Sequence, residues 1–231
     1  MAGRLLSLIA QRPRLIVSLP ANAPDLARAA ADGGADALKV HLRVKHLASG
    51  TEFGDLAAER PRLEQILALG LPVGLVPGTS HSLPDRAEME ELAAMGMDFF
   101  DLFARDMPAW MLAFEGMTRV AAVDGSADAQ MVRSLENIGV EMIEAAIVAP
   151  EGYGQPLRAA DLAAYCRLRC GTSLPIIVPT ERAITPEDVP LLVGRAGISA
   201  VMIGAVVTGR EPRSLRAAAE RFASALAETH R

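Results

Sequence analysis

The chain has 231 residues, of which 51% are hydrophobic and 22% charged, and its formal net charge is −5. These values suit one domain with a sizeable core. The charges of both signs are interspersed and aromatic residues make up only 4%, which excludes a basic, base-stacking surface for nucleic acid, and no apolar run approaches the ~20 residues that span a bilayer.

The N-terminal stretch "MAGRLLSLIAQRPR" has a short apolar run and no small-residue cleavage site. It therefore does not predict a signal peptide. Cys166 and Cys170 are too few for a disulfide framework, and no other cysteine or nearby histidine completes a zinc set. We expect two reduced thiols, which is typical of a cytoplasmic protein.

Strand-like and helical patterns alternate along the whole chain. Apolar runs of strand length begin near residues 14, 36, 72, 99, 118, 142, 175 and 200, and helical patterns cover 24–33, 59–69, 85–95, 107–116, 127–138, 158–170, 186–195 and 212–227. Four helix-to-strand junctions repeat one pattern, in which a glycine that can end a helix precedes a strand: "GGADALKV", "MGMDFFDL", "IGVEMIEA" and "AGISAVMI".

This alternation favours parallel strands joined by crossover helices. Eight such units in a chain close to the usual ~250 residues predict a (β/α)8 TIM barrel, formed as one domain over residues 1–231. The longest connection, 43–58, is a loop after the second strand. The alternative is an open doubly wound sheet, which needs a nucleotide fingerprint after the first strand, and "SLPANAPD" has none.

Side-chain parity predicts which strand residues face the barrel interior. In "DALKVHL", the apolar set Leu38, Val40 and Leu42 packs outward, so Lys39 and His41 point inward. The same argument on the other strands gives a set of inward polar residues: Ser18, Lys39, His41, Asp101, Asp124 and Glu144. Buried ionisable groups are costly unless paired, so this convergence predicts an active site, with a structural ion network as the alternative.

Of this set, Lys39, His41, Asp124 and Glu144 are the candidate catalytic residues, and Ser18 and Asp101 the candidate substrate-binding residues. His41, Asp101, Asp124 and Glu144 also have the right chemistry to bind a metal, but parity alone does not place them in one coordination sphere, and we predict no metal and no cofactor. His46, His81 and His230 fall in expected loops or the tail, where we expect them to be solvated.

The late segment "GISAVMIGAVVTGREPRSL" predicts a strand, a glycine-rich loop and a new helix. Barrels of this kind often bind phosphate at the loops after the last two strands, where backbone N–H groups and a helix dipole favour an anion. The candidate phosphate-binding residues are Arg182, Gly204, Thr208 and Gly209, with an ordinary turn as the alternative. Tyr153, in "APEGYGQPL", is a candidate to cover the substrate, or part of a plain surface loop.

Three segments resemble the ribulose-phosphate-binding barrel superfamily, and within it the N-acylmannosamine-6-phosphate 2-epimerases. They are "LIVSLPA" with "AAADGGADAL", "VDGSADAQMVRSLENIGVEMIEAAIVAPEGYG", and "TERAITPEDVPLLVGRAGISAVMIGAVVTGREP". The resemblance implies that Asp124 and Tyr153 meet a sugar and that Arg182 and Gly204 bind its phosphate. The family's catalytic Lys and Glu positions hold Pro77 and Thr180 here, with Glu181 adjacent as a further substrate-binding candidate.

The sequence thus predicts an enzyme that acts on a small phosphorylated metabolite, as a sugar-phosphate isomerase or epimerase that moves a proton α to a carbonyl. One alternative is a carbon–carbon lyase or synthase in which Lys39, its pKa lowered by burial and by a protonated His41, forms a Schiff base. Another is a ligand-binding barrel without turnover. We expect no nucleic-acid or membrane partner, and a homo-oligomer is among the assemblies that the sequence allows.

Overall fold

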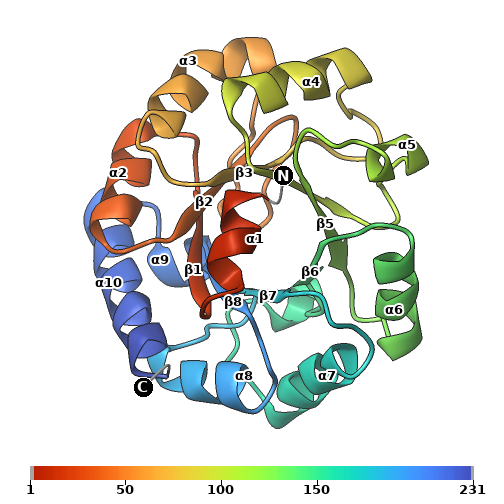
Figure 1. Ribbon diagram of the computed structural model, residues 1–231. Coiled ribbons are helices and arrows are strands. Elements are labelled where there is room, and N and C mark those ends of the chain that lie inside the picture. The colour runs from red at the N-terminus through yellow and green to blue at the C-terminus, as the bar shows by residue number, and fades with distance from the viewer. Residues whose placement is uncertain (1–2, 230–231) are drawn as a thin grey trace.

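The structure of the protein is a computed structural model that describes residues 3–229. Eight parallel strands close into a barrel in the order β1-β2-β3-β4-β5-β6-β7-β8, which confirms the predicted (β/α)8 architecture (Figure 1). The strands are β1 (Arg14–Ser18), β2 (Ala37–His41), β3 (Val73–Val76), β4 (Phe99–Phe103), β5 (Thr118–Val123), β6 (Met142–Ala145), β7 (Ile176–Pro179) and β8 (Ala200–Ile203).

Apart from α1, which precedes β1, the helices surround this barrel and follow the strands in turn (Figure 1). They are α1 (Arg4–Ile9), α2 (Pro24–Asp32), α3 (Leu56–Leu67), α4 (Arg86–Met95), α5 (Ala109–Leu112), α6 (Ala129–Asn137), η1 (Pro150–Gly152), α7 (Ala159–Arg169), η2 (Pro186–Asp188), α8 (Val189–Gly194), α9 (Ala205–Thr208) and α10 (Pro212–Glu228).

Local sequence signals fix where several helices begin and end. The side chains of Asp55, Asp85 and Asp128 each accept a hydrogen bond from a first-turn N–H of α3, α4 and α6, at 2.8–2.9 Å. These bonds satisfy N–H groups that have no partner inside the helix. Gly96 ends α4 in the left-handed conformation, with φ of 104°, which a residue without Cβ adopts without strain.

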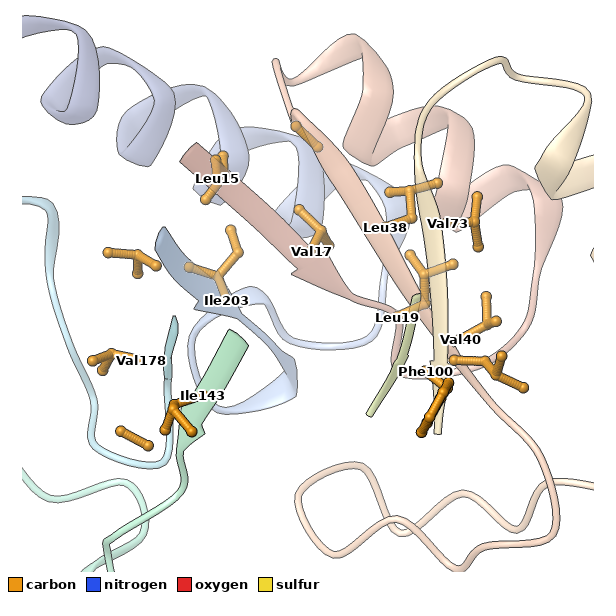
Figure 2. Close-up of a cluster of buried hydrophobic side chains, with 14 of the residues drawn as sticks. Leu15, Val17, Leu19, Leu38, Val40, Val73, Phe100, Ile143, Val178 and Ile203 are labelled. Atoms are coloured by element: carbon orange, nitrogen blue, oxygen red, sulfur yellow. The ribbon is translucent and has the colours of Figure 1, made fainter. Parts of the chain in front are cut away.

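The main core lies between the barrel wall and the helices. It is lined by the outward-facing side chains of alternate strand positions, including Leu15 and Val17 of β1, Leu38 and Val40 of β2, and Ile203 of β8 (Figure 2). All five are fully buried. This is the parity predicted from the sequence, and it leaves the residues between them to face the barrel interior.

A second core closes one end of the barrel. Leu5 and Ile9 of α1 pack with interior residues of the strands, among them Ile16, Phe99 and Val120. Helix α1 accordingly lies across the centre of the ring of strands (Figure 1). Because this end is sealed by apolar side chains, access to the interior is left to the opposite, C-terminal ends of the strands, which is where barrel enzymes place their active sites.

Several segments differ from the prediction, since α1 falls where no helix was expected and α9 lies within the expected glycine-rich loop. The helix expected over 107–116 is only the turn Ala109–Leu112, because the chain after it buries Phe114 and Met117 in the core instead of continuing the helix. The 43–58 loop contains an antiparallel bridge between Lys45 and Glu52. Over residues 3–229, no helix is long and apolar enough to cross a membrane, and both cysteines are free thiols.

Candidate functional site

Interior side chains stack in layers that alternate between odd and even strands, as in other barrels. The strand registers place Ile16, Gly74, Val120 and Ile177 of the odd strands in one apolar layer. The even strands supply the next layer toward the C-terminal ends, which holds Lys39, Asp101, Glu144 and Met202. Three of the four members of this layer are ionisable, directly above an apolar floor.

These three residues form one buried ion cluster, which we call the Lys39 triad. The Lys39 ammonium Nζ donates to Asp101 Oδ2 at 2.9 Å and to Glu144 Oε2 at 2.7 Å. The side chains of Lys39, Asp101 and Glu144 are 7%, 2% and 10% exposed. Three strands that are far apart in sequence are thus joined at one cation by two charge-assisted hydrogen bonds.

The charge state of the triad differs from the sequence-based expectation. Burial by itself lowers the pKa of Lys39, but the adjacent Asp101 and Glu144 outweigh it and raise the pKa. Burial and the neighbouring Glu144 raise the pKa of Asp101 well above its ordinary value. Burial opposes ionisation of Glu144 as well, but the Lys39 ammonium overcomes it and lowers the pKa. The expected neutral Lys39 is therefore wrong for the resting protein, in which Lys39 is a cation.

A cavity of about 600 Å³ lies above the triad at the C-terminal end of the barrel. It exists because the odd-strand layer over the triad, Ser18, Val76, Ala122 and Pro179, consists of small side chains that leave the centre unfilled. Its lining includes most of the sequence-predicted residues: Ser18, Lys39, His41, Asp101, Asp124, Glu144, Tyr153, Glu181 and Gly204. The volume suits a small-molecule ligand.

His41 lines the cavity as part of an aromatic cluster on the β2 side. Its ring lies 4.7 Å from that of His46 and 4.8 Å from that of Phe53, measured between centroids. Burial, His46 and Lys39 lower the pKa of His41 well below its ordinary value, so the ring is neutral and does not supply the positive charge expected beside Lys39. His46 is partly buried rather than fully solvated as expected, because the 43–58 loop folds it against His41 and Ser49.

Asp124 lies at the mouth of the cavity, directly after β5, and its side chain is 44% exposed. It pairs with Arg105 at 2.5 Å and accepts two hydrogen bonds from Ser126, which hold its pKa below the ordinary value. Its hydrogen-bond and ion-pair partners are therefore different from those of the Lys39 triad. Arg105 and Lys45 also line the cavity and were not among the predicted site residues. Each is a basic residue a few positions after the C-terminal end of a strand, β4 and β2 respectively, and this position could have indicated them.

Glu181 and Tyr153 meet on the side of the cavity formed by the ends of β6 and β7. The Tyr153 hydroxyl donates to Glu181 Oε1 at 2.8 Å, and the Val148 N–H donates to Oε2 at 2.9 Å. Burial raises the pKa of Glu181 to about 7 despite these two bonds. The pair connects the loop after β6 to the end of β7.

The four predicted phosphate-binding residues do not come together. Arg182 is outside the cavity lining, because it forms a two-pronged ion pair with Asp161, at 2.9 Å for both contacts, and also donates to the Gly152 carbonyl. Thr208 is buried beside Gly209 at the end of α9. Only Gly204 lines the cavity, and its own N–H donates to Thr180 Oγ1.

No group of three or more His, Cys, Asp or Glu side chains within residues 3–229 is arranged to hold a metal ion. Lys39 lies between the two carboxylates of the triad, so the position that a cation would occupy there is filled by the ammonium. The chemistry available to the site is that of an amine, two carboxyl groups, and the polar residues around the cavity.

No protein-family model matches the chain, and a search of curated proteins finds no similar sequence. Solved structures do match. Mycobacterium tuberculosis tryptophan synthase superposes with a TM-score of 0.76 at 16% identity, covering 98% of this chain and 99% of that one. A mutant tryptophan synthase alpha-subunit from Pyrococcus furiosus gives 0.69 at 15% identity, over 92% and 99%.

The carboxyl transferase domain of Rhizobium etli pyruvate carboxylase, solved with pyruvate, gives a TM-score of 0.60 at 17% identity, over 96% of this chain and 50% of that one. At these identities the likeness shows the (β/α)8 fold. The resemblance to N-acylmannosamine-6-phosphate 2-epimerases is not supported. The expected isomerase or epimerase function is wrong by the same comparison, because the matching structures bear the names of a synthase and a carboxylase.

Proposed function

We propose that the protein is a carbon–carbon lyase or synthase that binds a small carbonyl compound covalently through Lys39. The observation that carries this proposal is the placement of Lys39, a buried amine at the floor of the cavity with a carboxyl group within 3 Å on either side. Lysine amines form Schiff bases with carbonyl substrates, and the protonated imine then accepts the electron pair of a breaking or forming carbon–carbon bond.

The proton that Lys39 carries at rest has a short route away from the amine. Glu144 Oε2 is 2.7 Å from Nζ, so the proton moves to Glu144 as the carbonyl carbon approaches. The amine nitrogen then bonds to that carbon, and the carbonyl oxygen takes up protons from the nitrogen and from Glu144 and leaves as water. The product is a protonated imine on Lys39, with the same total charge as the starting ammonium and neutral carbonyl group.

The remaining walls favour a substrate with an anionic or polar end. Gly204 has no side chain, and its nearest neighbour in the direction of a Cβ is Ser18, at 3.7 Å. Ala205 and Val206 open α9, so their N–H groups have no acceptor earlier in this helix. Together with the basic Lys45 of the cavity lining, these groups support a substrate that carries a phosphate or carboxylate. This anionic group would bind near Gly204 rather than near Arg182.

Reductive trapping tests the proposal directly, because lysine occurs only at positions 39 and 45. The protein is incubated with pyruvate, glyoxylate or dihydroxyacetone phosphate, borohydride is added, and intact mass and peptide mapping locate the adduct. We expect an adduct at Lys39 that is lost in Lys39→Met and kept in Lys45→Arg, a control on the same cavity. An adduct only at Lys45 or the N-terminal amine, or none with any of the three probes, would contradict the proposal.

A further inference from the structure

The Lys39 triad contains one cation and two carboxyl groups, and its three side chains are at least nine-tenths buried. The fourth member of the layer, Met202, is apolar and also buried, so it cannot balance a second negative charge. The charged groups that act on Asp101 are Lys39 and Glu144. Two ionised carboxylates would leave this buried layer with a net negative charge, which is costly in a low-dielectric interior.

One oxygen of the triad has no donor. Asp101 Oδ2 accepts from Lys39, whereas Asp101 Oδ1 is buried and no group donates a hydrogen bond to it. A carboxylate oxygen that is buried without a hydrogen-bond donor destabilises the folded protein. A carboxylic acid at the same place has a hydroxyl instead, and the neighbouring acceptor for it is the Glu144 carboxylate, which binds the same Lys39 ammonium.

The geometry also decides which of the two carboxyl groups holds the charge. Glu144 makes the shorter bond to Lys39, at 2.7 Å against 2.9 Å, and its side chain is 10% exposed against 2% for Asp101. The group that is closer to the cation and less desolvated ionises more easily. The proton therefore belongs on Asp101.

We propose that Asp101 is a neutral carboxylic acid in the resting protein and acts as a positioning residue, accepting from Lys39 and donating to Glu144. This deepens the proposed function, on which its catalytic consequence rests. With Asp101 neutral, Lys39 and Glu144 form a balanced pair, and transfer of the Lys39 proton to Glu144 leaves an amine and two acids with the same total charge. The amine can thus form inside the cavity without releasing a proton to solvent.

Infrared spectroscopy tests the protonation state without any substrate, so it is independent of the proposed lyase or synthase function. The spectrum is recorded at about pH 9, where Glu181 is ionised because its pKa is about 7. We expect a carbonyl-stretching band of a protonated carboxylic acid that shifts when aspartate side-chain carboxyls are labelled with ¹³C and stays when glutamate is labelled. No such band, or a band that shifts only with labelled glutamate, overturns the proposal.

Asp101→Asn tests the positioning role, because an amide keeps one acceptor for Lys39 and one donor for Glu144 without an ionisable proton. We expect this variant to lose the infrared band, to keep the pH profile of wild-type adduct formation, and to form the Lys39 adduct faster than Asp101→Ala, whereas Asp101→Ala and Glu144→Gln slow adduct formation about 100-fold or more. If folded Asp101→Asn slows it as much as Asp101→Ala, the positioning role is overturned. If Asp101→Asn does not fold, the labelled wild-type spectra still decide the protonation state.

Discussion

The phenyl ring of Phe99 on β4 occupies the space that a side chain at Gly74 on β3 would need. A Cβ added at Gly74 would overlap three atoms of this ring. Phe99 is 1% exposed and belongs to the apolar core that closes the barrel beneath the Lys39 triad. The absence of a side chain at Gly74 is therefore what allows a large aromatic ring to form this part of the floor.

Gly74→Ala should destabilise the protein by about 1–3 kcal/mol or more, because the ring has no space to move into within a packed interior. Denaturant unfolding measures the change. Phe99→Leu in the Gly74→Ala background should recover part of the loss. Gly194→Ala is the matched control, since nothing lies within 4 Å of its Cβ position in α8, and it should be neutral or stabilising. Equal effects at the two glycines would contradict the packing argument.

The Arg182–Asp161 pair should be structural rather than ligand-binding. The side chains are 12% and 10% exposed, and removing one partner leaves the other charge buried. Arg182→Leu should therefore cost about 3–5 kcal/mol of unfolding free energy, and the double variant with Asp161→Leu should recover much of it. Arg216→Leu removes one partner of an exposed ion pair in α10. It should leave the midpoint of denaturant unfolding unchanged. If Arg182→Leu instead has normal stability and no longer binds inorganic phosphate, Arg182 is a phosphate-binding residue and the structural role is contradicted.

Glu181 should make stability fall as pH rises from about 4.5 to about 7. Burial raises its pKa from 4.5 to about 7, so the folded protein keeps a proton that the unfolded chain has already lost over this window. The shift corresponds to about 3 kcal/mol. As pH rises from 4.5 to 8, the free energy of unfolding of Glu181→Gln should increase by about this much relative to that of wild type. Glu90→Gln, at an exposed position, should show no such increase. A constant difference between wild type and Glu181→Gln at both pH values would contradict the raised pKa.

The two histidines beside the cavity should stay neutral throughout the physiological range. Burial is the main cause in both cases, and it lowers the pKa of His46 to about 4 and that of His41 well below its ordinary value. Their imidazole NMR resonances should show no titration between pH 5 and pH 8. A midpoint near 6.5 for His41 would instead mean that it exchanges protons with solvent, and would return it to the list of candidate acids and bases.

Local patterns in the sequence were enough to predict the barrel. The eight strands begin within a residue of the expected positions, because alternating apolar residues and helix-ending glycines act over a few residues and need no distant partner. The same parity correctly placed Lys39, Asp101 and Glu144 in the interior. The helix predicted over 107–116 was too long and is only Ala109–Leu112 in the structure. The reason is that burial of Phe114 and Met117 is a tertiary effect that overrides helical patterning.

The sequence by itself determined which side chains face the barrel interior, because the period of a strand is a local property. Only the tertiary structure decided which of them touch. Lys39 meets Glu144 across 105 residues of chain, and this contact depends on the register of every strand between them. The same holds for Arg182. The sequence predicted that its guanidinium binds a ligand, whereas in the fold it forms an ion pair with Asp161 of α7. Charge states followed these contacts, since burial and the nearest opposite charge together set a pKa, and neither can be read from a strand pattern.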